Sequence, residues 1–225
     1  ALIPVSGGKV NFLVVGADKV GYNTDTIMVA TINLNEPKIS LMSVPRDTKA
    51  RVNGHTMKIN AVYSYSKNTG IPAEETLIET VSSITGIGIN YYAIVDTTAF
   101  REIVDALGGI EYNVRPQGYY YNDPLQDLYI NIPGGKQILD GKQAEGLVRF
   151  RHDYARADLE RVEIQQDVIK ELIKQKLNIK YISKVPQIYK TVSDNVISNL
   201  KVGDIADYAR EVLSVGTENI KTYTM

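Results

Sequence analysis

Three short apolar segments near the N-terminus limit what this chain can fold into. Their ranges are 10–16, 26–34 and 39–44. Short apolar runs rich in branched residues and bounded by turn residues are typical of buried strands. The turn-forming Asn35-Glu-Pro-Lys38 separates the last two, which we expect to pair as a hairpin. Pro45 then ends the third strand and places Arg46 just beyond it.

Helical patterns alternate with further strands over the rest of the chain. Apolar spacing predicts helices at 73–85, 97–107, 158–177, 179–193 (interrupted by Pro186) and 203–215. Strands are predicted at 91–95, 110–114, 128–132 and 147–151, the last preceded by a helical turn at 140–145. The segment 115–135 is otherwise predicted to be a loop. This mixture, without a break in composition, predicts a single α/β domain over residues 1–225.

The composition excludes several classes of function. A net charge of −1 and a pI near 6.2 argue against broad binding to nucleic acid. No segment approaches the ~20 continuous apolar residues of a membrane-spanning helix. The absence of cysteine excludes disulfides, thiol nucleophiles and thiolate metal sites.

Arginines gather in one short segment of this nearly neutral chain. Four of the nine lie close together: Arg149, Arg151, Arg156 and Arg161. The planar guanidinium fork fits a phosphate or carboxylate in pairs of hydrogen bonds. In the predicted strand 147–151, Arg149 and Arg151 share a face, which is unfavourable without an anion. Arg161 and Gln165 share a face of the following helix. The segment therefore predicts a site for a compact anion.

The plainer interpretation of this arginine cluster is a set of surface ion pairs. Asp153, Asp158 and Glu160 lie nearby in the sequence and could supply the carboxylates. For Arg46 beside Asp47, a surface salt bridge is likewise the simple alternative.

Two aspartates near the N-terminus form an acidic counterpart. Asp18 follows the first predicted strand and Asp25 precedes the second. Two carboxylates on one turn can hold Mg²⁺ or Mn²⁺, which prefer oxygen ligands and often bind substrate phosphates too. Capping of the turn is the ordinary alternative.

These elements occur in the order and spacing of one protein family. They are Gly16-Ala-Asp18, Thr24-Asp-Thr-Ile-Met28, Ser43-Val-Pro-Arg-Asp47, Lys58-Ile-Asn60, Val104-Asp-Ala-Leu-Gly-Gly109 and Arg149-Phe-Arg151 followed by Asp158, Arg161 and Gln165. Over about residues 10 to 170, the sequence resembles the LytR-CpsA-Psr family of bacterial cell-envelope phosphotransferases. The C-terminal helices, about 179–215, lie beyond the motifs.

The resemblance implies an activity. Such proteins transfer a glycopolymer, for example teichoic acid or capsular polysaccharide, from a polyprenyl-pyrophosphate carrier to a peptidoglycan hydroxyl. The implied fold is a central mixed sheet flanked by helices, with an apolar pocket for the polyprenyl tail. Members carry an N-terminal membrane helix and act on the extracellular face of the plasma membrane. The start at Ala1, without an initiator Met, fits a missing anchor.

The resemblance also assigns roles to residues. The pyrophosphate would lie among Arg46, Arg149, Arg151, Arg161, Gln165, Lys58 and Asn60, of which the three arginines 46, 149 and 151 are catalytic. Asp18 and Asp25 would hold Mg²⁺, and Asp25 could alternatively act as the catalytic base. For Lys58 and Asn60, capping of a helix start is the alternative.

One position departs from the family pattern. Asn23 stands where members often have arginine, so one cationic contact to the phosphate is missing unless Lys19 or another side chain replaces it. This departure leaves two rival functions open. One is a non-catalytic protein that binds polyprenyl phosphates or glycans, and the other is a polyprenyl-pyrophosphate hydrolase.

Overall fold

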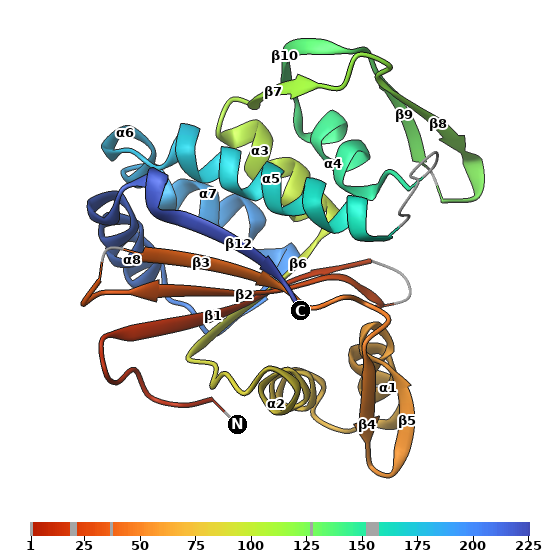
Figure 1. Cartoon of the computed structure of the whole chain (residues 1–225), viewed down its shortest axis with the longest axis vertical. Coiled ribbons are helices and arrows are strands. Elements are labelled where there is room, and N and C mark those ends of the chain that lie inside the picture. Colours follow the sequence, from red (N-terminus) through yellow and green to blue (C-terminus); the bar gives the residue numbers. More distant parts are fainter. Residues whose placement is uncertain (1, 19–21, 37, 127, 152–157) are drawn as a thin grey trace. The chain divides into compact units, whose positions relative to one another are not determined.

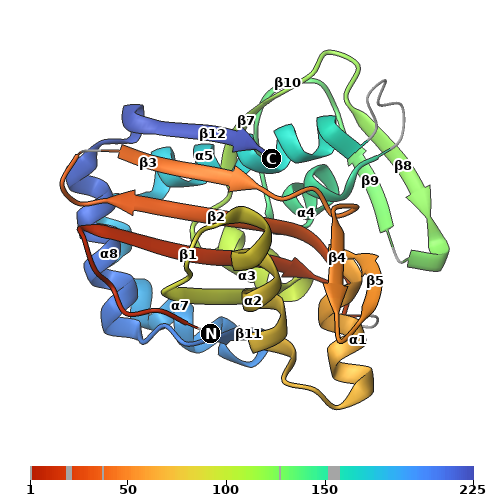
Figure 2. The same ribbon diagram turned by 60° about the horizontal axis from the view of Figure 1, so that its bottom comes forward.

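The N-terminal strands form the middle of a six-stranded mixed sheet with the order β11-β6-β1-β2-β3-β12. The strands are β1 (Lys9–Ala17), β2 (Thr24–Asn33), β3 (Lys38–Ser43), β6 (Tyr91–Asp96), β11 (Val196–Ser198) and β12 (Ile220–Thr224). β1 pairs antiparallel with β2 and parallel with β6, whereas β2 and β3 form the predicted antiparallel hairpin (Figure 2). The four predicted strands of this sheet are confirmed, and β11 and β12 were not predicted.

The computed structural model describes residues 2–18, 22–36, 38–126, 128–151 and 158–225. By its internal contacts the chain divides into two compact units (Figure 1). The first comprises Ala1–Thr97 with Asn195–Met225 and contains the sheet, and the second comprises Thr98–Asp194. Within the described residues, no helix combines the length and the apolar character required to cross a bilayer.

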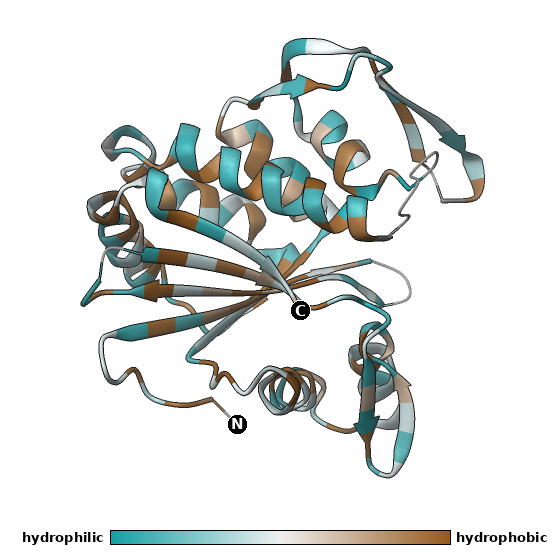
Figure 3. Ribbon diagram, in the orientation of Figure 1, coloured by the Kyte–Doolittle hydropathy of each residue, from teal (hydrophilic) through white to brown (hydrophobic). Residues whose placement is uncertain are grey.

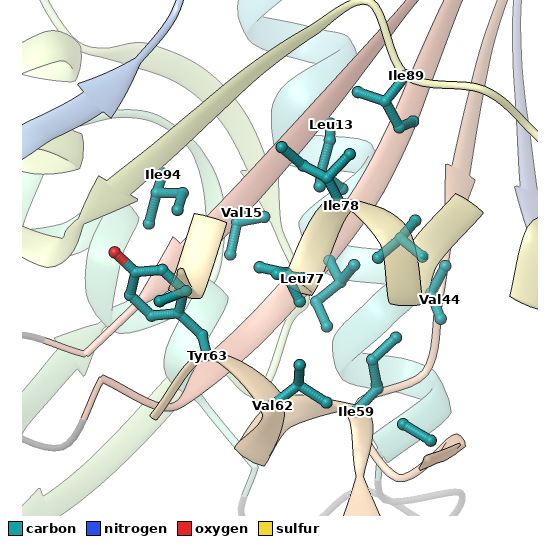
Figure 4. Packing of buried hydrophobic residues seen from close by; sticks show 14 of the residues in the cluster. Leu13, Val15, Val44, Ile59, Val62, Tyr63, Leu77, Ile78, Ile89 and Ile94 are labelled. Carbon is teal, nitrogen blue, oxygen red and sulfur yellow. The ribbon is translucent and has the colours of Figure 1, made fainter. Parts of the chain in front are cut away.

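Strand periodicity assigns the two faces of the sheet in the first unit to different helices. Leu13 and Val15 are buried against α1 (Val62–Thr69) and α2 (Ala73–Thr85), in the core of Figure 4. The alternate residue Phe12 points the other way, where its ring meets Tyr208 of α8 (Val202–Val215) at 5.1 Å between centroids. Hydrophobic and hydrophilic residues accordingly follow one another along the strands (Figure 3). This α/β arrangement, a mixed sheet flanked by helices, confirms the predicted fold class.

A polar contact joins the two helices on the first face. The Tyr63 hydroxyl of α1 donates to Glu74 of α2 at 2.8 Å, and Lys67 lies 3.3 Å from the same carboxylate. Burial would raise the pKa of Glu74, but hydrogen bonds from its own backbone and from Tyr63, with the Lys67 charge, bring that pKa below its ordinary value. The contact therefore stabilises the fold at neutral pH and loses this effect as the pH falls through the folded-state pKa.

Three short elements of the first unit connect β3 to α1. They are β4 (Lys49–Val52), β5 (His55–Lys58) and the 3₁₀ turn η1 (Ile59–Ala61), none of which was predicted. β4 and β5 form an antiparallel hairpin.

The second unit is built from helices and two hairpins. Its helices are α3 (Thr97–Ala106), α4 (Gly141–Arg149), α5 (Asp158–Lys176), α6 (Ile179–Ile182) and α7 (Val185–Val192). Its strands are β7 (Ile110–Val114), β8 (Tyr119–Asp123), β9 (Leu128–Ile132) and β10 (Gly135–Leu139), with β7 paired to β10 and β8 to β9. They enclose a separate core that includes Val104, Ile110, Leu139, Leu147 and Phe150. Pro186 lies in the first turn of α7 and so separates two helices rather than interrupting one.

Two predictions for this unit are wrong. The predicted loop 115–135 contains β8 as well as the expected β9. The predicted strand 147–151 is mostly helix, since α4 continues to Arg149 and is followed by the extended residue Phe150. The helix starts at a capping box, in which the Asp140 side chain accepts from the Gln143 backbone and the Gln143 side chain accepts from the Asp140 backbone.

Gly141 allows α4 to approach the backbone of α3. A Cβ at this position would clash with the Arg101 carbonyl oxygen and lie 2.8 Å from the Arg101 Cα. We expect Gly141→Ala to lower the free energy of unfolding by about 1–3 kcal/mol, the usual range for overpacking. The measurement is the urea midpoint at constant m value.

Gly203 in α8 is the matched control, because nothing lies within 4 Å of its Cβ position. Gly203→Ala should leave the stability unchanged or raise it slightly, since alanine favours helix. A Gly141→Ala protein as stable as Gly203→Ala would contradict this account of the α3–α4 contact.

Candidate functional site

A β-bulge presents the first candidate carboxylate. Gly16 of β1 pairs with Thr26 of β2, but the next residue, Ala17, pairs with Thr24, so Asp25 is the extra residue on its strand. Bulges redirect side chains and are frequent beside active sites. Asp25 therefore lies inside β2, not before it as predicted, and its side chain is 48% exposed.

Asp18 follows directly after β1, as predicted. Its backbone N–H donates to the carbonyl oxygen of Asn23 at 3.0 Å, which closes the β1–β2 connection. Asn23, the position where the family often has arginine, thus lies at the same end of the strand pair as both aspartates. Lys19, its suggested replacement, lies outside the described residues.

Arg46 reaches the bulge from the segment after β3. Its Nη1 lies 3.1 Å from Oδ1 of Asp25, and its Nε lies 4.0 Å from Asp47. Lys58 in turn pairs with Asp47 at 2.9 Å, and the Asn60 backbone N–H donates to the Arg46 carbonyl oxygen at 3.2 Å. Lys58 makes no side-chain cap on the following 3₁₀ turn. The first unit therefore brings these predicted residues together in one chain of contacts.

The two aspartates form a limited set of metal ligands. Among the residues that the structure describes, no three His, Cys, Asp or Glu side chains are grouped closely enough to hold an ion. Mg²⁺ is usually bound by one or two carboxylates, water and substrate phosphates rather than by a protein cage. Asp18 and Asp25, at one end of the same strand pair, fit this mode of binding.

A buried carboxylate organises the arginines of the second unit. Arg149 is the last residue of α4, and its Nη1 lies 2.8 Å from Oε1 of Glu145, one helical turn earlier. The other oxygen, Oε2, contacts Nε of Arg101 on α3. The Glu145 side chain is only 3% exposed, whereas those of Arg149 and Arg101 are 28% and 36% exposed. Sequence reasoning identified neither Glu145 nor Arg101.

The other predicted residues of this unit lie in different environments. Arg151 is exposed and follows the extended Phe150, so it does not share a strand face with Arg149. Arg161 and Gln165 on α5 are buried, at 2% and 6% exposure. Gln165 donates to the carbonyl oxygen of Val148 at 3.1 Å and so ties α5 to the last turn of α4. Arg156 and Asp153 lie outside the described residues.

The candidate residues thus divide into two groups. Asp18, Asp25, Arg46, Lys58 and Asn60 belong to the first unit, and Arg149, Arg151, Arg161 and Gln165 to the second. Their gathering around one diphosphate stays a prediction.

The first unit also contains an apolar cavity. It has a volume of about 240 Å³ and lies between α8 and the strands β1, β2 and β6. Its lining includes Phe12, Ile32, Tyr208, Ala209 and Val212. Such a cavity can hold a segment of hydrocarbon.

Residues 3–225 match the model of the LytR_cpsA_psr family. The chain belongs to this family. The match confirms the resemblance predicted from the motifs and extends it over nearly the whole chain.

Proteins similar to this LytR_cpsA_psr chain carry different names. Regulatory protein MsrR of Staphylococcus aureus (strain COL) is 31% identical over 224 residues, which cover 97% of this chain and 64% of MsrR. The polyisoprenyl-teichoic acid–peptidoglycan teichoic acid transferase TagU of Oceanobacillus iheyensis is 30% identical over 195 residues, covering 85% and 59%. The chain therefore spans about three fifths of the length of these relatives.

The fold is similar to solved structures as well. The crystal structure of a protein named transcriptional regulator EF0465, from Enterococcus faecalis, superimposes with a TM-score of 0.80 at 26% identity. The similarity covers 96% of this chain and 76% of that one.

The Asp25–Arg46 pair is predicted to contribute little to stability. Both side chains are partly exposed, and such pairs are worth about 0–1 kcal/mol. We expect Asp25→Asn to change the free energy of unfolding by less than about 1 kcal/mol in a urea titration. A larger loss at unchanged m value would mean that the pair is structural.

Proposed function

We propose that this chain transfers a cell-wall glycopolymer from a polyprenyl-diphosphate carrier to peptidoglycan. The name of the TagU relative supports this reaction, since it specifies a polyisoprenyl-linked teichoic acid and a peptidoglycan acceptor. The single observation that carries the proposal is Arg149, which is held on a buried carboxylate and yet remains partly exposed. A guanidinium held in one direction can donate paired hydrogen bonds to the oxygens of a diphosphate.

The reaction needs little covalent participation by the protein. The oxygen of the acceptor hydroxyl attacks the phosphorus that bears the glycan, and the bond from that phosphorus to the polyprenyl phosphate breaks. Polyprenyl phosphate leaves, and the hydroxyl proton passes to a base, for which Asp25 is a candidate. Catalysis of such a transfer is mostly positioning and charge stabilisation, the role we assign to Arg46, Arg149, Arg151, Arg161 and Gln165.

The carboxylates suit a divalent ion in this reaction. Mg²⁺, or Mn²⁺, held by Asp18 and Asp25 would neutralise charge on the phosphate oxygens. If Asp25 is the base instead, Asp18 is the remaining carboxylate ligand. Lys58 and Asn60 are secondary candidates for contact with the diphosphate.

The substrate also determines where the protein would act. Its polyprenyl tail is held in a membrane, and peptidoglycan lies outside the cell. We therefore place this domain at the extracellular face of the plasma membrane, attached by an N-terminal helix. The apolar cavity beside α8 would take part of the tail.

A role in transcription, which the name of the EF0465 protein gives for that protein, fits this chain less well. Duplex DNA is bound through several uncompensated cationic contacts to phosphates. Here the net charge is −1, so the chain has no overall excess of positive charge for such contacts.

Replacing Arg151 tests the proposal with little risk to the fold, since its side chain is exposed. We expect Arg151→Ala to slow transfer by roughly 10²–10³-fold, the usual loss for one group that stabilises charge in the transition state. The assay combines protein, Mg²⁺, a lipid-diphosphate-linked glycan and peptidoglycan fragments. Arg210→Ala, an exposed arginine on α8, is the control and should retain full activity.

The same assay separates the rival functions by product. A wild-type protein that binds the donor without turnover would favour the non-catalytic binder that Asn23 suggests. Release of free glycan phosphate without coupling to peptidoglycan would favour the hydrolase.

A larger side chain in the apolar cavity tests whether the polyprenyl tail binds there. Ala209 lines the cavity, so a phenylalanine there would displace hydrocarbon. Exclusion of about two methylenes, each worth ~0.8 kcal/mol, corresponds to about tenfold weaker binding. We expect this loss for Ala209→Phe with a fluorescent prenyl phosphate. Glu211→Phe, which adds the same ring at an exposed position of α8, should bind normally, and equal binding by both variants would exclude the cavity as the tail site.

A further inference from the structure

A contact that no sequence motif indicated links three side chains of the second unit. The Glu145 carboxylate accepts from Arg149 through Oε1 and from Arg101 through Oε2. We refer to these three residues as the Arg101–Glu145–Arg149 bridge. The carboxylate lies beneath the surface, and the two guanidinium groups are partly exposed.

Local packing of α3 and α4 builds this bridge. The Gly141 backbone N–H donates to Asp105 of α3 at 2.7 Å, and the absence of a Gly141 side chain lets the two backbones approach. One turn further along α4, Glu145 therefore meets Arg101. Another turn places Arg149 on the same helix face, where a Glu–Arg pair four residues apart is favourable.

Both arginines of the bridge keep part of their surface exposed while their guanidinium groups contact the same buried carboxylate. Arg101 is therefore held at the same carboxylate as Arg149, the arginine to which the proposed function assigns the diphosphate. The planar guanidinium fork binds phosphate oxygens in pairs of hydrogen bonds.

From this geometry we infer that Arg101 binds the donor's diphosphate together with Arg149, and that Glu145 is the positioning residue that holds both. The inference rests on the proposed function and adds two residues to it. Glu145 does not touch the substrate, and it acts by fixing the direction of the two guanidinium groups.

The first test is calorimetric binding of inorganic pyrophosphate, which does not depend on turnover. Arg101→Gln leaves Glu145 paired with Arg149, so the fold should persist. We expect its affinity to fall about tenfold or more, as for the loss of a charge-assisted contact. Lys142→Gln removes one positive charge from an exposed position of α4 and should change the affinity by less than about threefold, because exposed charges are screened.

The outcomes of this titration separate two failures. If the wild-type protein binds pyrophosphate and Arg101→Gln binds it equally well, the role of Arg101 is refuted and the proposed function stands. If the wild-type protein does not bind pyrophosphate at all, the proposed donor site itself is refuted.

The second test concerns Glu145 and uses transfer kinetics. Glu145→Gln keeps the shape of the side chain, but its amide nitrogen cannot accept from the second guanidinium. We expect kcat to fall about tenfold or more while KM for the donor changes little, because the positive charge remains but is misdirected. Wild-type values of both constants would refute the positioning role. If this variant does not fold, the Arg101→Gln titration decides the inference.

Discussion

The pairing of one buried carboxylate governs the second unit. Burying a carboxylate as deeply as that of Glu145 is costly unless cations and hydrogen-bond donors compensate its lost hydration. Arg101 of α3 and Arg149 at the end of α4 supply this compensation. The same interaction thus holds two helices together and fixes the direction of an arginine predicted to bind phosphate. It depends on Gly141, since any larger residue would separate the two backbones.

In the first unit, the charged side chains of Asp25 and Arg46 pair at the surface instead. The bulge at Asp25 interrupts the regular pairing of β2 and directs the Asp25 carboxylate toward solvent, where Arg46 contacts it. An exposed pair contributes little to folding, and its partners can exchange for a metal ion or a phosphate at low cost. The buried pair around Glu145 cannot exchange in this way, because a bare carboxylate would remain. The first unit is therefore suited to adaptable ligands, and the second to a fixed direction of charge.

Most of the fold could be predicted from local signals. The ranges 73–85, 110–114 and 128–132 match α2, β7 and β9 because periodicity and turn residues mark both of their ends. The missed strands are short or largely exposed, so they carry little apolar signal and form through tertiary pairing. They are β4, β5, β8, β10, β11 and β12.

The site was less predictable because its partners are not local. The alternation of Val148 and Phe150 with two arginines fits a strand, yet the capping box of Asp140 and Gln143 starts a helix that continues to Arg149. A helix through this segment places Glu145 four residues before Arg149, the spacing of a helical ion pair. Arg101, by contrast, is 44 residues from Glu145, and no spacing rule connects them. Motifs can therefore indicate which arginines are expected to bind a phosphate. Only the packing of α3 on α4 shows which side chains position Arg149.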